Sequence, residues 1–245
     1  TKDGVEFLSY ARQVVEQTNL LEERYKSHTE TRELFSVSSQ HYAFVVNAFV
    51  SLLKRADMTR YELFLRETRT YEIIEDVKNF RSEIGVLFLN SYNRDVLTKM
   101  FDDNRLTYTS LFKARPHIFV SKSNPLAKHE VVSLEDLEEF PYLSYDQGIH
   151  NSFYYSEEIL SQIPHKKSIV VSDRATLFNL LIGLDGYTIA TGILNSNLNG
   201  DNIVSIPLDI DDEIDIVYLK HEKATLSKMG EKFLDNLVKE VTFDN

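Results

Sequence analysis

The chain has 245 residues, of which 42% are hydrophobic and 27% charged, a composition typical of a soluble globular protein. Its net charge of −11 disfavours nucleic-acid binding by this segment, because such binding needs clustered lysine and arginine. The lack of cysteine excludes disulfides, thiolate metal sites and a cysteine nucleophile, and it fits a reducing, cytoplasmic setting. The sequence contains no apolar run of about 18 residues, so no membrane span is expected. The N-terminus does not resemble a signal peptide.

Residues 1–27 are predicted to form one long helix. Alternating spacings of four and three define a heptad seam of Phe7, Ala11, Val14, Thr18, Leu21 and Tyr25. The helix could pack on its own domain. Pairing with a second chain is favoured, however, because the polar segment KSHTETRE separates the helix from the first strand.

From residue 34, predicted strands and helices alternate along the chain. Strands are expected at 34–37, 61–65 and 84–89, and helices at 42–55 and 71–80. The strand IGVLFL is apolar on both faces, as a parallel strand covered on both sides should be. This alternation predicts right-handed βαβ units.

A second set of elements begins near Leu106. LTYTSLFKARPHIFVSK predicts two strands bent at Arg115-Pro116, and residues 133–136 have the form of a capping box. Further strands are expected in PYLSYDQG, SIVVSD, YTIATG and IVSIPLDIDDEIDIVYL. Helices are expected after SIVVSD, at the end of YTIATG and over 227–241.

These elements form two α/β halves that the chain joins twice, near 106–113 and near 200–208. Two crossings without a Gly/Ser-rich linker favour a hinged pair. We expect one subdomain of residues 28–108 and 204–245, and a second of residues 109–203.

Polar residues follow the predicted strands in both halves, where open α/β sheets bind ligands. Hydroxyl groups and free N–H groups at a helix N-terminus favour an anion. Ser38 or Ser39 could instead merely cap the helix at 42–55, and His41 could be structural. The candidates for ligand binding are Ser38, Ser39, Gln40, His41, Asn90, Ser91, Ser144, Tyr145, Asp146, Thr191 and Gly192.

Catalysis and metal binding are not expected. Ser38 and Ser39 lie outside any G-x-S-x-G elbow, and the histidines lack an H-E-x-x-H spacing. The acidic stretch 209–215 resembles half a calcium loop, but it lacks the central glycine, and Lys220 stands where a glutamate is needed. We therefore predict no enzyme activity, no cofactor and no metal site.

The order of motifs resembles the LysR-type transcriptional regulators over essentially all 245 residues. TKDGVEFLSYARQVVEQ is similar to the end of the winged helix-turn-helix domain running into the linker helix. SKSNPLAKHEVVSLEDLEEFPYL resembles the family segment "hPLa … vsl.dL…P.i", with Asn124 where histidine is usual. IGLDGYTIATG is similar to "G.Gia.lP" with one extra residue and no proline, and IVSIPL resembles the strand that re-enters the first subdomain.

The resemblance implies an α/β fold of two Rossmann-like subdomains, as in type 2 periplasmic binding proteins, preceded by the linker helix. It implies a truncated chain without the DNA-binding domain that contacts promoter DNA in the homodimer or homotetramer. Members that sense sulfur metabolites carry a Thr/Ser-Gln pair after the first strand, which Ser39-Gln40 resembles, with Ser144-Tyr145 as the partner loop. A small effector, amino-acid-like or sulfur-metabolite-like and anionic or zwitterionic, is therefore expected between the subdomains.

A solute-binding protein of a transporter is the alternative function, because it uses the same fold. A monomeric receptor has no need of the N-terminal heptad helix, which favours the regulator. A helix-turn-helix encoded upstream of Thr1 would support the regulator, and a signal peptide the transporter.

Overall fold

The computed structural model describes residues 33–55, 60–194 and 200–242, together with residues 1, 4, 7, 11, 14, 15 and 18. It divides into two units, Thr1–Leu34 with Met58–Glu62, and Phe35–Asp57 with Leu63–Asn245. In the first unit, residues 4, 7, 11, 14, 15 and 18 are helical, and the Thr18 hydroxyl donates to the Val14 carbonyl. The rest of the helix predicted over 1–27 lies outside the described residues.

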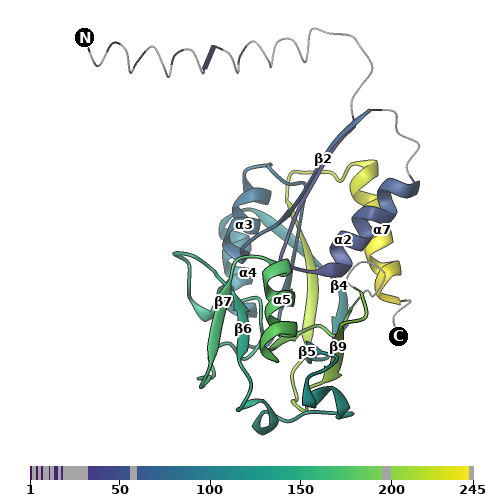
Figure 1. Cartoon of the computed structure of the whole chain (residues 1–245). Coiled ribbons are helices and arrows are strands. Elements are labelled where there is room, and N and C mark those ends of the chain that lie inside the picture. Colours follow the sequence, from purple (N-terminus) through teal and green to yellow (C-terminus); the bar gives the residue numbers. More distant parts are fainter. Residues whose placement is uncertain are drawn as a thin grey trace. The chain divides into compact units, whose positions relative to one another are not determined.

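Sheet A has five strands in the order β2-β1-β3-β10-β4. Figure 1 labels its two outer strands, β2 and β4. Their bounds are β1 Glu33–Ser39, β2 Tyr61–Glu67, β3 Ile84–Leu89, β4 Leu106–Ala114 and β10 Ile214–His221. β1 and β3 are parallel, whereas β10 runs antiparallel to β3 and β4. The parallel pair confirms the βαβ unit predicted from the alternating pattern.

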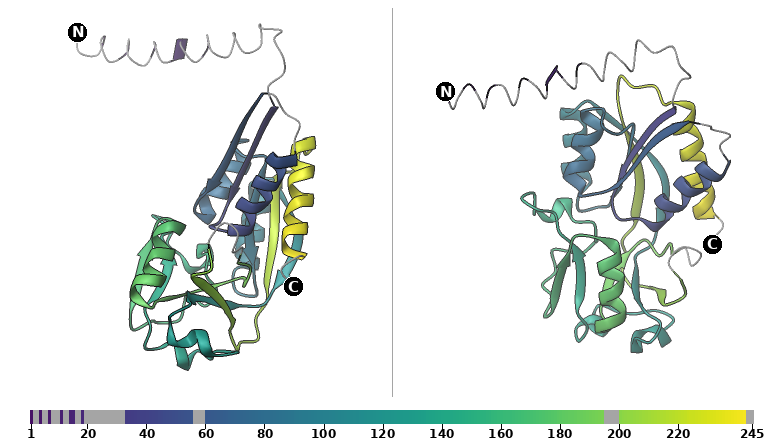
Figure 2. Two further views of the ribbon diagram at one scale, coloured as in Figure 1. Left: turned by 45° about the vertical axis from the view of Figure 1, so that its right-hand side comes forward. Right: turned by 45° about the horizontal axis from the view of Figure 1, so that its top comes forward.

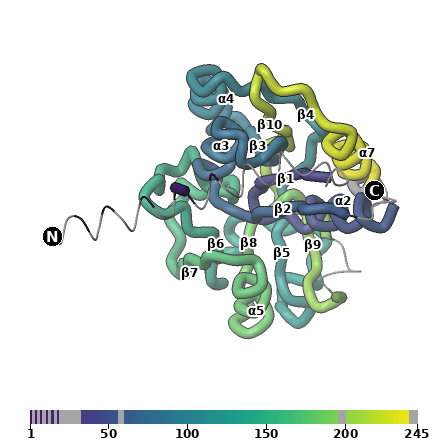
Figure 3. The backbone as a smooth tube through the Cα atoms, turned by 90° about the horizontal axis from the view of Figure 1, so that it is seen from above, coloured from purple at the N-terminus to yellow at the C-terminus, as the bar shows by residue number. Residues whose placement is uncertain are grey.

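Helices pack against both faces of sheet A (Figure 3). They are α2 Ala43–Arg55, α3 Thr70–Lys78, α4 Arg94–Asp103 and α7 Lys228–Thr242. α2 packs against α7, and Phe35 of β1 contacts Phe49 of α2 and Phe233 of α7. On the other face, α3 lies so close to β3 that a Cβ at Gly85 would come within 2.8 Å of Ile73. The helix at 94–103 was not predicted from the sequence.

Sheet B has the order β7-β6-β8-β5-β9, in which Figure 3 labels its strands. Figure 2 shows the teal and green strands of this half from two sides. Its strands are β5 His117–Ser121, β6 Tyr142–Tyr145, β7 Ser168–Val171, β8 Tyr187–Ala190 and β9 Ile203–Pro207. β6 is parallel to β7 and β8, and β5 is antiparallel to β8 and β9. The helix α5 Arg174–Leu184 buries Leu177 and Leu181 in the core of this sheet.

Short 3₁₀ helices complete the second half: η1 Pro125–Lys128, η2 Glu135–Leu137 and η3 Phe153–Tyr155. The predicted capping box precedes η2, where Asp136 accepts from the Ser133 backbone N–H and the Ser133 hydroxyl accepts from the Asp136 N–H. Sheet A with its helices is called subdomain I below, and sheet B with α5 and the 3₁₀ helices subdomain II.

The chain passes from subdomain I to subdomain II after β4 and returns after β9. The boundaries predicted at 108/109 and 203/204 come a few residues earlier than these crossings. β4 continues in sheet A to Ala114, and β9 pairs with β5 in sheet B. We propose that the subdomain boundaries follow the sheets to which β4 and β9 belong. The sequence pattern of a strand does not reveal which sheet the strand joins.

Candidate functional site

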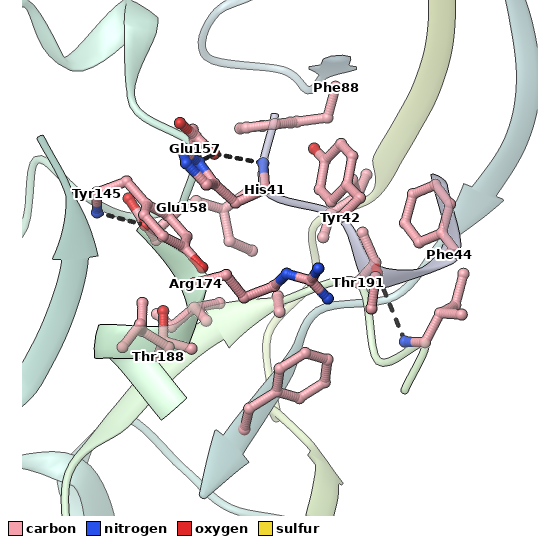
Figure 4. A pocket seen from close by; sticks show the side chains of 18 of the residues that line it. His41, Tyr42, Phe44, Phe88, Tyr145, Glu157, Glu158, Arg174, Thr188 and Thr191 are labelled. Atoms are coloured by element: carbon pink, nitrogen blue, oxygen red, sulfur yellow. Dashed lines mark hydrogen bonds and ion pairs between the residues drawn. The ribbon is translucent and has the colours of Figure 1, made fainter. Parts of the chain in front are cut away.

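A pocket lies between sheet A and sheet B, with walls from both subdomains (Figure 4). Subdomain I supplies the segment that enters α2 and the side chain of Phe88 at the end of β3. Subdomain II supplies the loop 157–159, the N-terminus of α5 and the end of β8. The atom-free space between these walls is about 630 Å³, including the part open to solvent.

His41 crosses from subdomain I to contact Glu157 of subdomain II. The imidazole Nδ1 and the backbone N–H of His41 lie 2.8 Å and 2.9 Å from the same carboxylate oxygen of Glu157. Burial opposes the charged ring, but the hydrogen bond and charge of Glu157, with the charge of Glu67, outweigh it and raise the pKa of His41. The ion pair therefore joins the two walls of the pocket.

Glu157 occupies the position predicted for an anionic ligand. His41 lies just before the N-terminus of α2, where free N–H groups and the helix dipole attract negative charge. The carboxylate that accepts from this N–H belongs to the chain itself, and its second oxygen accepts from the Gln147 amide. In this state of the pocket, the anion at α2 is an internal one.

Arg174 is the second bridge between the subdomains. Its Nε lies 3.1 Å from Oε1 of Glu67 on β2, and its Nη2 lies 3.4 Å from Oε2 of the same carboxylate. Burial raises the pKa of Glu67, although the nearby Arg174 charge lowers it. Figure 4 shows the guanidinium extending from the α5 side toward the centre of the pocket, between Tyr145 and Thr191.

Glu158 is a buried carboxyl in the same pocket wall, with 3% of its surface exposed. Its Oε1 accepts from the backbone N–H of Tyr145, whereas its Oε2 accepts no hydrogen bond from any described residue. Burial and the charge of Glu157 raise the pKa of Glu158 well above its ordinary value. Burial therefore opposes the ionisation of this carboxyl, in contrast to that of an ordinary surface glutamate.

Two further contacts close the edge of the pocket between the subdomains. Arg69 binds Asp146 through Nη2–Oδ2 at 2.5 Å and through Nε to the Asp146 carbonyl at 3.1 Å. The Thr70 N–H at the start of α3 donates to the Gln147 amide oxygen. Three ion pairs and the Thr70–Gln147 hydrogen bond thus join the subdomains, in addition to stacked aromatic rings.

The sequence model of the LysR substrate-binding domain matches residues 38–242. The chain belongs to the LysR family. No curated protein matches it in sequence. Among the described residues of this LysR domain, no helix is long and apolar enough to cross a membrane. The described side chains also include no group of three His, Cys, Asp or Glu residues that could hold a metal ion.

Several solved structures share the fold of the LysR domain at low sequence identity. The effector-binding domain of QuiR in complex with shikimate is 16% identical, with a TM-score of 0.56, over 85% of this chain and 97% of that one. A full-length BenM variant is 16% identical, with a TM-score of 0.59, and the match covers 100% of this chain and 79% of that one. A full-length OxyR variant from Pseudomonas aeruginosa is 14% identical, with a TM-score of 0.59, over 97% and 80%. These likenesses confirm the predicted two-subdomain fold.

Three predicted site residues line the pocket of the LysR domain: His41, Tyr145 and Thr191. His41 and Tyr145 stack on each other, and the Thr191 hydroxyl caps the Ile193 N–H at 3.5 Å. His41 of subdomain I and Tyr145 of subdomain II thus meet across the pocket. That these three residues bind a ligand stays a prediction.

Ser38, Ser39 and Gln40 lie behind the pocket wall. The Ser38 hydroxyl donates to Asp76 at 2.6 Å, and the buried Ser39 hydroxyl has no hydrogen-bond partner among the described residues. Gln40 donates to Thr70 and accepts from the Phe88 N–H and the Tyr42 hydroxyl. Neither serine hydroxyl caps α2, and their proposed effector contacts would need a different state of the cleft.

The remaining predicted residues lie outside the pocket wall. Asn90 and Ser91 bind Asp212, within subdomain I. Ser144 is half-buried beside β7, and Asp146 binds Arg69 at the edge of the cleft. Gly192 adopts φ +82° against the His117 ring.

Sequence reasoning missed Arg174, Glu67, Glu157 and Glu158. A signal for Arg174 was present, because it follows a parallel strand and starts a helix, as Ser39 does. Glu157 and Glu158 lie in a loop without regular structure, where no pattern marks a pocket residue.

Proposed function

We propose that this LysR domain is the regulatory part of a transcriptional regulator and senses a small polar metabolite, anionic or zwitterionic, in the pocket between its subdomains. The observation that carries the proposal is that the polar groups of the pocket bridge the two subdomains. A ligand that enters between His41 and Arg174 must compete with the His41–Glu157 and Glu67–Arg174 pairs.

This competition gives the effector a way to act at a distance. A ligand shifts a conformational equilibrium only by the difference in its affinity for the two states. An effector that replaces contacts between the subdomains changes their preferred separation. In a homodimer or homotetramer, that change would alter how the DNA-binding domains meet promoter DNA. The LysR family match favours this function over a transporter receptor of the same fold.

A thermal-shift screen of cellular metabolites tests the proposal. A ligand present at about 100 times its Kd stabilises the folded domain by about 2.7 kcal/mol, which corresponds to roughly 5–10 °C in Tm. Thr191→Val removes a pocket hydroxyl without changing the side-chain volume, and we expect it to weaken effector binding by roughly 10-fold. Thr109→Val, on the exposed outer strand β4, is the matched control and should bind as the unmodified chain does.

The proposal fails if no metabolite stabilises the domain, or if the effector binds the Thr191→Val and unmodified chains equally. X-ray scattering with and without the effector adds an independent readout, because the proposal requires a change in the radius of gyration on binding.

A further inference from the structure

Hydrogen bonds beside the pocket form a closed ring of buried residues from both subdomains. In subdomain I, the Gln40 amide donates to the Thr70 hydroxyl at 2.7 Å, and the Thr70 N–H donates to Oε1 of Gln147 at 3.1 Å. In subdomain II, Nε2 of Gln147 donates to Oε1 of Glu157 at 3.1 Å. The other oxygen of this carboxylate accepts from the N–H of His41, the residue after Gln40. The ring therefore starts and ends in the same segment of subdomain I.

Gln147 is the residue of the ring whose two ends face different partners. It is 7% exposed, and its side chain meets the Thr70 N–H at one end and the Glu157 carboxylate at the other. An amide provides the acceptor and the donor that these two positions need. A carboxylate at position 147 would still accept from Thr70, but it would face Glu157 with a like charge and no donor. An apolar side chain there would leave both partners unpaired.

The segment that carries Gln147 is held on subdomain I. Residues 146–155, which we call the strap, leave β6 of subdomain II and contact α3, α4 and the residues just before them. These contacts are the Arg69–Asp146 ion pair, the stacks of Tyr71 on His150 at 3.5 Å and of Tyr92 on Tyr154 at 4.9 Å, and the hydrogen bond from the Tyr155 hydroxyl to Met100. Gln147 thus belongs to subdomain II in the chain, but its position depends on contacts with subdomain I.

We propose that Gln147 is a positioning residue of the effector site, which holds the Glu157 carboxylate on His41 and so sets how strongly an effector must compete for this position. Glu157 lines the pocket, whereas Gln147 is not among the described residues that line it, so Gln147 acts through Glu157. The inference rests on the proposed function and names the residue on which the internal competitor of the effector depends. The alternative is that Gln147 merely caps α3, because Thr70 is the first residue of that helix and its N–H has no acceptor within the helix.

Two backbone N–H groups report on the two ends of the Gln147 side chain. The Thr70 N–H donates to its oxygen, and the His41 N–H donates to the carboxylate that its nitrogen binds. NMR-detected hydrogen exchange follows both groups in the effector-free chain, because an amide exchanges when its hydrogen bond opens. The Ile73 N–H, which donates to the Arg69 carbonyl, shows whether α3 remains folded. A cap protects Thr70 alone, whereas a positioning residue protects His41 as well.

Gln147→Glu separates the two roles, because it keeps the acceptor for Thr70 and replaces the donor to Glu157 with a second carboxylate. We expect the His41 amide to exchange about 10-fold faster, while the Thr70 amide keeps its rate. Glu157→Gln should also speed the exchange of the His41 amide by about 10-fold. Its single amide oxygen cannot accept from both Gln147 and the His41 N–H, which lie at opposite ends of the group.

The double variant, Gln147→Glu with Glu157→Gln, exchanges the two groups. The amide at position 157 then donates to the carboxylate at position 147 and accepts from the His41 N–H, and the Thr70 N–H keeps its acceptor. The exchange rate of the His41 amide should return close to its original value, whereas two independent defects would combine to about 100-fold. Glu139→Gln, at a side chain that is 79% exposed, is the control and should leave both rates unchanged.

The inference is overturned if Gln147→Glu leaves the exchange of the His41 amide unchanged, if the Thr70 amide alone responds, or if the two defects add in the double variant. All of these rates are measured without an effector, so they do not depend on the metabolite screen. If no metabolite stabilised the domain, the proposed function would fail, and the hold of Gln147 on Glu157 would still stand. If an effector bound through Thr191 and the His41 amide ignored Gln147→Glu, only the inference would fail.

Discussion

The imidazole of His41 and the phenol of Tyr145 lie face to face, with ring centroids 4.0 Å apart and planes 8° from parallel. His41 precedes α2 of subdomain I, and Tyr145 ends β6 of subdomain II. The stacking therefore joins two strand ends that are more than a hundred positions apart in the sequence. Since Glu157 binds the same imidazole, protonation of His41 is coupled to how firmly the subdomains hold each other.

The first prediction concerns pH. The raised pKa of His41 means that the folded state binds the proton more tightly than the unfolded chain. The ion pair with Glu157 then stabilises fully below about pH 6.5, and its stabilisation is lost as the pH rises through the folded value. The Tm difference between the unmodified chain and His41→Asn should be largest near about pH 5.5 and shrink toward about pH 8.5.

Glu157→Gln should give the same flattened profile, because the imidazole loses its partner. The two variants change the neighbouring carboxyls differently, because the His41 charge lowers the pKa of Glu67 and the Glu157 charge raises the pKa of Glu158. A flattened profile in both variants therefore identifies the His41–Glu157 pair. A Tm difference that does not change with pH would refute the coupling.

The second prediction compares the contributions of Gln40 and Ser39 to stability; both residues were predicted from the sequence to bind the ligand. The Gln40 amide is 1% exposed and bonds Thr70, Tyr42 and the Phe88 N–H. Gln40→Ala leaves these groups unpaired and should destabilise the domain by about 1–3 kcal/mol. Ser39→Ala removes a hydroxyl that already lacks a partner, and should be neutral or slightly stabilising. Urea unfolding of both variants checks this, and equal losses of stability would contradict it.

Much of the fold could be predicted because it depends on local patterns. The run IGVLFL predicted β3 at its observed bounds, and the turn at Arg115-Pro116 falls between β4 and β5. The site was harder, because its chemistry depends on contacts across the cleft. Ser38 and Gln40 have the residue types of a ligand site. However, Ser38 donates to Asp76, 38 positions away, and Gln40 donates to Thr70, 30 positions away. Only the packing of two subdomains brings Glu157 to His41, 116 positions apart.

The third prediction concerns the edge of the cleft. Arg69 and Asp146 form an ion pair between the subdomains with side chains that are 38% and 42% exposed. Such pairs contribute only about 0–1 kcal/mol to stability, so Arg69→Glu should hardly change Tm. It should, however, favour an open cleft, seen as a larger radius of gyration in X-ray scattering. The double variant Arg69→Glu with Asp146→Arg restores the opposite charges and should return to the original radius. An unchanged radius in Arg69→Glu would show that this pair does not hold the cleft.

The last prediction tests the crossing between the subdomains through two glycines. Gly192 has φ +82°, and a Cβ there would lie 2.6 Å from Nδ1 of His117, which is bonded to the Arg115 carbonyl at the crossing. Gly192→Ala should therefore cost about 1–2 kcal/mol for the left-handed backbone alone, and it must also displace the His117 ring. Gly183 lies inside α5, and beyond its chain neighbours and its own helix backbone no atom of a described residue lies within 4 Å of an added Cβ. Gly183→Ala should stabilise the domain by about 0.5–1 kcal/mol, because alanine favours the helix. In thermal unfolding, Gly192→Ala should therefore lower Tm and Gly183→Ala should raise it. An unchanged Tm of Gly192→Ala would show that the crossing accommodates the Cβ without strain.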